Sequence, residues 1–85
     1  MEVKTNTEWS AYVVGQMHKY RITGVELASR CKHATGDKYS PTYLSSVLNG
    51  KKEFSGPEAE AQTRDVILAA LEGLVAEREV ITDEN

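Results

Sequence analysis

A short stretch with a helix signal at each end constrains the fold of this chain most. Ser40 is a favoured N-cap residue, and Pro41 suits the first helical position, where a backbone N–H has no helical partner. Asn49 and Gly50 mark the other end, because glycine readily adopts the left-handed conformation that follows a last helical turn. These signals predict a helix over residues 41–49. A helix this short is unstable alone in water, so it must pack on a scaffold.

The predicted helix has an apolar face and a polar face. Leu44, Val47 and Leu48 recur at the spacing of three and four residues that forms one stripe on a helix. The other faces carry short hydrogen-bonding side chains, and two lysines follow the helix: Thr42, Ser45, Ser46, Asn49, Lys51 and Lys52. This pattern predicts that the apolar stripe packs on a core while the polar face contacts a partner.

Two segments of the chain resemble the lambda-repressor-like (Cro/XRE-type) helix-turn-helix proteins. Residues 43–52 resemble the recognition helix of that family, and residues 22–28 resemble the start of its positioning helix. The likeness extends toward residue 9. It implies an all-α fold, a small helix-turn-helix bundle of about four helices. One departure is an extended turn before the recognition helix, because the interval from Ala28 to Ser40 is longer than the family's usual spacing.

Signals elsewhere predict two helices before the recognition helix. Thr7 is a plausible N-cap for the first, whose apolar stripe ends near Tyr20. Thr23 and Glu26 form a capping box at the start of the second, in which each side chain accepts a hydrogen bond from the other residue's backbone N–H.

A strong apolar stripe predicts a last helix over residues 57–79. The helix-turn-helix domain then covers residues 7–79. Residues 1–6 show no periodicity and are expected to form a mobile arm, and residues 80–85 are expected to form a frayed tail.

The extended turn leaves room for a longer second helix. We expect part of the excess to lengthen that helix through Lys32 or His33, with Gly36 as the residue after its end. Tyr39 takes the place of the apolar residue that fills the turn, so its ring is expected inside. Cys31 is expected to be a small buried residue, and His33 to face solvent near a helix end.

The length and charge fit one small domain with two differently charged parts. A chain of 85 residues has a core that is only just large enough to fold alone. The net charge of −3 argues against nucleic acid, yet residues 15–52 carry seven basic and two acidic side chains, or +5. Residues 53–85 carry two basic and nine acidic side chains, or −7. Such a distribution indicates two surfaces with different partners.

The sequence contains no set of residues typical of catalysis. It has no glycine-rich phosphate loop and no defensible nucleophile–base arrangement, so we expect no enzyme activity, no cofactor and no small-molecule substrate. Its one cysteine and two histidines are too few for a closed zinc site, so no metal is expected. A single cysteine suits a reducing cytoplasm, and no apolar run is long enough to span a membrane.

The resemblance implies that the recognition helix enters the major groove of double-stranded DNA. The family's register places base contacts along this helix, at Pro41, Thr42 and Ser46, with Tyr43 and Ser45 beside them. Phosphate contacts are implied at the start of the second helix, in the turn and around the recognition helix: Thr23, Gly24, Lys38, Ser40, Asn49, Lys51 and Lys52. Lys32 in the turn can add to these. The implied function is a sequence-specific, repressor-like transcriptional regulator of phage or mobile-element type.

Two alternatives remain for the role of the last helix in assembly, and two for the kind of partner that the protein binds. We expect a homodimer through the last helix, with Val66, Ala70 and Leu74 in its seam, although these side chains can instead close the monomer core. The alternative function is a protein-interaction module, antitoxin-like or an inhibitor, whose acidic C-terminal half binds a basic partner.

Overall fold

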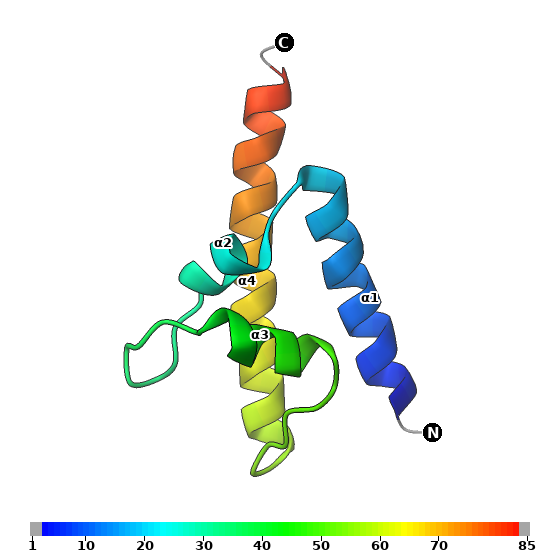
Figure 1. Ribbon diagram of the computed structural model, residues 1–85, viewed down its shortest axis with the longest axis vertical. Helices are drawn as coiled ribbons and strands as arrows, with labels where there is room; N and C mark the ends of the chain where they lie inside the picture. Colours follow the sequence, from blue (N-terminus) through cyan, green and yellow to red (C-terminus); the bar gives the residue numbers. More distant parts are fainter. Residues whose placement is uncertain (1–2, 84–85) are drawn as a thin grey trace.

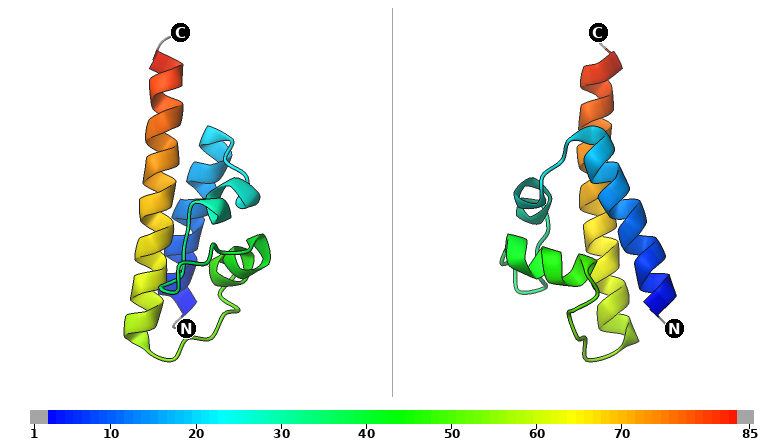
Figure 2. Two further views of the ribbon diagram at one scale, coloured as in Figure 1. Left: turned by 90° about the vertical axis from the view of Figure 1, so that its left-hand side faces the viewer. Right: turned by 45° about the vertical axis from the view of Figure 1, so that its right-hand side comes forward.

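The computed structural model describes residues 3–83, which form four helices around one core. They are α1 (Val3–Tyr20), α2 (Gly24–Ser29), α3 (Pro41–Leu48) and α4 (Pro57–Asp83). α4 runs along the whole molecule, α1 lies to its right, and the short α2 and α3 cross in front of α4 (Figure 1). The two turned views show α2 and α3 together on one side of α4 (Figure 2). This arrangement confirms the prediction of a small all-α bundle.

The two long helices lie side by side and run in the same direction. Near their beginnings, the guanidinium of Arg64 on α4 lies 5.4 Å from the ring centroid of Trp9 on α1. Near their ends, the Tyr20 hydroxyl donates a hydrogen bond of 2.9 Å to Glu79. α1 and α4 therefore form a platform, and α2 and α3 pack against it.

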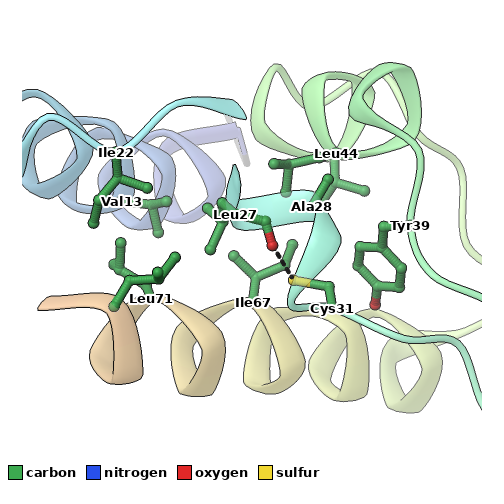
Figure 3. Packing of buried hydrophobic residues seen from close by; sticks show 11 residues of the cluster. Val13, Ile22, Leu27, Ala28, Cys31, Tyr39, Leu44, Ile67 and Leu71 are labelled. Carbon is green, nitrogen blue, oxygen red and sulfur yellow. Dashed lines mark hydrogen bonds between the residues drawn. The ribbon is translucent and has the colours of Figure 1, made fainter. Parts of the chain in front are cut away.

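Each of the four helices contributes side chains to a single apolar core (Figure 3). α2 and the residues next to it supply Ile22, Leu27, Ala28 and Cys31. The other buried members are Val13, Tyr39, Leu44, Val47, Ile67, Leu71 and Leu74. The Cys31 thiol donates to the Leu27 carbonyl at 3.3 Å, as expected for a small side chain that the core encloses. The predicted burial of Cys31 and Tyr39 is confirmed.

The burial of Leu74 contradicts its predicted place in the dimer seam. Its side chain is 0% exposed, because it follows Ile67 and Leu71 on the stripe of α4 that faces the core. Val66 and Ala70 are half-buried and pack against the same core. Leu74 thus closes the monomer, as the alternative reading of this stripe held, and the homodimer stays a prediction without it.

The ends of α3 lie where the sequence signals predict them. Ser40 is the N-cap, and its hydroxyl oxygen accepts from the Tyr43 backbone N–H at 3.0 Å. Pro41 occupies the first turn, Asn49 is the C-cap, and Gly50 has a φ of +72°. Local capping therefore decides the length of this helix.

α2 is shorter than predicted and is followed by a β-hairpin. It ends at Ser29 with Arg30 as its C-cap, so the expected extension through Lys32 or His33 is wrong. Lys32 and Lys38 instead form an antiparallel β-bridge, and Gly36, with a φ of +98°, lies in the tip rather than after a helix. We call residues 31–39 the turn hairpin.

The two ends of the turn hairpin lie next to each other. The Tyr39 N–H donates to the Cys31 carbonyl at 2.9 Å, and the His33 N–H donates to the Asp37 carbonyl at 2.8 Å. Because Cys31 and Tyr39 are paired, the excess residues form a side excursion and do not separate α2 from α3. This explains how the two helices remain neighbours across a long connection.

α1 begins earlier, and α4 ends later, than the sequence predicts. α1 begins at Val3 and not after Thr7, so the expected mobile arm over residues 1–6 is wrong for residues 3–6. α4 continues to Asp83, so the frayed tail predicted for residues 80–85 is wrong for residues 80–83. The remaining parts of both predictions lie outside the described residues.

Candidate nucleic-acid interface

α3 turns a row of short polar side chains toward solvent. Leu44 and Val47 are buried against the core, which leaves the opposite side of the helix uncovered. Of the residues implied as base contacts, three are exposed and two are half-buried: Pro41, Thr42 and Ser45 in the first group, Tyr43 and Ser46 in the second.

The hydrogen bonds within α3 decide what each hydroxyl can offer a partner. Ser46 donates to the Tyr43 carbonyl at 2.8 Å, so its oxygen is left to act as an acceptor. Ser45 accepts from the Asn49 side-chain amide at 3.2 Å, which leaves its proton available for donation. Two consecutive residues of α3 thus offer a donor, at the exposed Ser45, and an acceptor, at the half-buried Ser46.

Tyr43 lies on the side of α3 that faces the turn hairpin. Its ring centroid is 4.8 Å from that of Tyr39 and 4.8 Å from that of His33, both in edge-on arrangements. His33 is therefore half-buried in an aromatic cluster, and the prediction that it faces solvent near a helix end is wrong. The cluster restricts the orientation of the Tyr43 ring.

The start of α2 lies beside α3. A hollow of about 260 Å³ lies between Gly24 and α3. Its polar side is formed by Gly24, by Pro41 and Ser45 of α3 and by the C-cap Asn49, and its floor is apolar: Val14, Leu44 and Leu48. The Thr23 hydroxyl oxygen accepts from the Glu26 N–H at 3.0 Å, which leaves its proton free to donate. Residues implied as phosphate contacts at the start of α2 are thus next to residues implied as base contacts.

The lysines after α3 are held close to its last turn. The backbone N–H groups of Lys51 and Lys52 both donate to the Ser46 carbonyl, at 2.8 and 3.2 Å. The Lys52 ammonium lies 5.6 Å from the ring centroid of Tyr43. Both side chains are exposed, so they add two positive charges at the end of α3. Lys38 is not part of this group, because it lies in the turn hairpin.

The acidic side chain nearest the start of α2 is neutralised from α4. The Arg78 guanidinium donates to both carboxylate oxygens of Glu26, at 2.7 and 2.8 Å. These bonds are the main reason that the pKa of the Glu26 carboxyl is lowered, and the backbone N–H of Thr23 lowers it to a smaller extent. Of the predicted capping box, the bond from the Glu26 N–H to the Thr23 hydroxyl is present. Because Glu26 is paired, its charge repels an anion at the α2 N-terminus less strongly.

Two more polar contacts tie the acidic end of α4 to the rest of the fold. Arg30 forms a two-pronged ion pair with Glu77, with both distances at 3.0 Å, and this pairing lowers the pKa of the Glu77 carboxyl. Glu79 accepts from the Tyr20 hydroxyl. Part of the acidic C-terminal half therefore pairs within the chain.

Sequence reasoning missed Arg21 as a candidate phosphate contact. It is exposed, and it lines a second hollow of about 420 Å³ with His18, Thr23 and Leu48. Its φ of +58° lies in the left-handed region, where glycine is the usual residue after a helix. The position of Arg21 directly before Ile22 and Thr23, where the second helix is predicted to start, is the sequence signal that could have indicated this role.

Other kinds of functional site find no support among the described residues. Among them, no group of three or more histidines, cysteines and acidic residues is placed to hold a metal ion. Burial raises the pKa of the Cys31 thiol to about 11, so it stays a neutral thiol and is a poor ligand. Within residues 3–83, none of the helices combines the length and apolar character needed to cross a membrane.

Comparison of the chain with models of protein families, with curated proteins and with solved structures found no match.

Proposed function

We propose that this protein binds double-stranded DNA sequence-specifically, in the manner of a lambda-repressor-like helix-turn-helix regulator, and represses transcription. α3 is the recognition helix and enters the major groove, while α2 contacts the backbone beside it. The observation that carries the proposal is the hollow in which Gly24 at the start of α2 lies next to Pro41 and Ser45 of α3. One surface then offers backbone N–H groups to a phosphate and hydroxyl groups to bases.

The charges around α3 support the same proposal. Lys51 and Lys52 follow the helix, and Glu26 near the start of α2 is paired with Arg78. A net negative charge does not oppose DNA binding when the basic side chains gather on the contacting face. The first turn of α3 has no arginine, glutamine or asparagine, so we expect DNA shape to contribute much of the specificity.

The alternative of a protein-interaction module receives less support. It needs the acidic half of α4 to be available, but Glu77 and Glu79 contact Arg30 and Tyr20 of the same chain. Two copies bound to half-sites about one helical turn apart would supply the affinity that one short helix lacks. Their interface is not assigned, since Leu74 is enclosed in the monomer core.

Selection on randomised duplex DNA followed by gel shift tests this function. The wild type should enrich one motif. Thr42→Ala and Ser46→Ala should change the preferred bases at one or two positions of that motif, each by about 1–3 kcal/mol. Ser55→Ala is the matched control, because its exposed hydroxyl lies in the loop before α4. Failure to enrich any motif, or the same motif from all four proteins, would refute the base-reading role of α3.

A further inference from the structure

The turn hairpin holds two lysines opposite each other. The hydrogen bonds from Tyr39 N–H to Cys31 and from His33 N–H to Asp37 flank the bridge on either side. Lys32 and Lys38 are therefore a non-hydrogen-bonded pair, the arrangement in which opposed side chains of an antiparallel ladder lie closest. Two like charges placed this way repel each other and destabilise the hairpin.

Both ammonium groups face away from the core. Cys31 and Tyr39, the neighbours of the two lysines, are buried, and successive side chains of a strand point to opposite faces. Lys32 and Lys38 are exposed. Within the described residues, neither lysine forms an ion pair with a carboxylate. Asp37 lies beside them, but its carboxylate accepts from the Thr35 hydroxyl at 3.4 Å.

The hairpin is attached to α3 and to α4. The His33, Tyr39 and Tyr43 rings lie 4.5–4.8 Å apart, and Tyr43 belongs to α3. Tyr39 and Thr63 of α4 also line one hollow, so the hairpin lies against α4. These contacts hold the lysine pair in a fixed position relative to α3, at the end where that helix begins (Figure 1).

We propose that the turn hairpin is a second DNA-binding element, in which Lys32 and Lys38 together hold one backbone phosphate next to the groove that α3 occupies. This inference rests on the proposed function. A phosphate between the two ammonium groups removes their mutual repulsion, and lysine binds phosphate as a compact point charge. The contact carries no base information, so it adds affinity for any duplex.

Reversing one charge of the pair tests the proposal, because stability and binding should change in opposite directions. Lys32→Glu places a carboxylate opposite Lys38, so the melting temperature should rise or stay unchanged. Affinity for a duplex of unrelated sequence, followed by fluorescence anisotropy, should fall by about tenfold more than in the control. Lys19→Glu is the control, because it makes the same charge change on α1, where the ammonium lies over the Tyr20 ring.

A second variant removes the pair without adding a negative charge. Lys32→Ala combined with Lys38→Ala should keep its helix signal and reduce the salt dependence of binding by about one unit per bound protomer. Equal affinity losses in Lys32→Glu and Lys19→Glu, with the salt dependence of the double variant unchanged, would overturn the role of the hairpin alone. Wild-type protein that binds no duplex, or binds an acidic polypeptide more tightly than DNA, would overturn the proposed function and the hairpin's role with it.

Discussion

Arg78 joins three helices, and replacing it tests how α2 is held in place. One terminal nitrogen of its guanidinium donates to both carboxylate oxygens of Glu26 on α2, and its Nε donates to the Tyr20 carbonyl at the end of α1 at 3.2 Å. The side chains of Arg78 and Glu26 are 27% and 32% exposed, so solvent screens the pair only in part. Arg78→Met keeps much of the side-chain volume and removes every one of these hydrogen bonds.

The expected loss of stability lies between that of a buried and an exposed ion pair. A hydrogen bond to a charged group contributes about 1.5–3 kcal/mol, whereas exposed ion pairs contribute about 0–1 kcal/mol. At the exposure of Arg78 and Glu26 we expect Arg78→Met to lower the free energy of unfolding by about 1–2 kcal/mol. For a domain of this size the melting temperature should fall by about 5–10 °C.

Urea titration of four proteins isolates the contribution of the pair. The set is the wild type, Arg78→Met, Glu26→Gln and the double variant, which together form a double-mutant cycle. Coupling of more than about 0.5 kcal/mol is expected, with Lys51→Met as a control that removes an exposed charge and changes little. A cycle without coupling, or an Arg78→Met variant as stable as the Lys51→Met control, would refute the role assigned to this contact.

Three further predictions follow from the core and the charges. Leu74→Glu should unfold the chain, with a loss of more than about 4 kcal/mol, while Ala69→Glu on the exposed side of α4 should keep the circular dichroism of the wild type. Arginines lower the pKa values of Glu26 and Glu77 below the ordinary 4.5. The two carboxylates should therefore contribute fully to stability above about pH 4.5, and this contribution should be lost as the pH falls through their folded-state pKa values. Urea titrations down to about pH 3 would show the loss. Iodoacetamide near pH 8 should alkylate Cys31 slowly in the folded chain and rapidly in urea, and equally fast reaction in both would contradict its burial.

Helix ends that depend on local capping were predictable from the sequence. Ser40, Pro41 and Asn49 act through neighbouring backbone groups, so α3 begins and ends where they indicate. The capping box of Thr23 and Glu26 is local in the same way. The end of α1 at Tyr20 and the start of α4 at Pro57 also lie where the sequence predicts them. The start of α1 and the end of α4 were predicted too short, because Thr7 does not cap the first helix and no stop residue follows residue 79.

The turn hairpin, the enclosure of Leu74 and the position of Gly24 beside α3 were not predictable. The turn hairpin lacks the alternating apolar pattern of a strand pair, and Gly36 was its only strong turn signal. The enclosure of Leu74 depends on how much of the α4 stripe α1 and α2 cover, which sequence spacing alone does not measure. The residues implied as base contacts were recognisable as a group, but the position of Gly24 beside them required the packing of α2 on α3.

The backbone hydrogen bond from Tyr39 to Cys31 should also make the connection between α2 and α3 tolerant of insertion. Since residues 32–38 begin and end at adjacent points, excursions of other lengths and charges that keep the His33 ring against Tyr43 should leave both helices in place. If the lysine pair holds a phosphate, such exchanges change how tightly the protein binds DNA while α3 keeps its choice of sequence. A part of the affinity is then encoded in a segment separate from α3 and can evolve independently of its specificity.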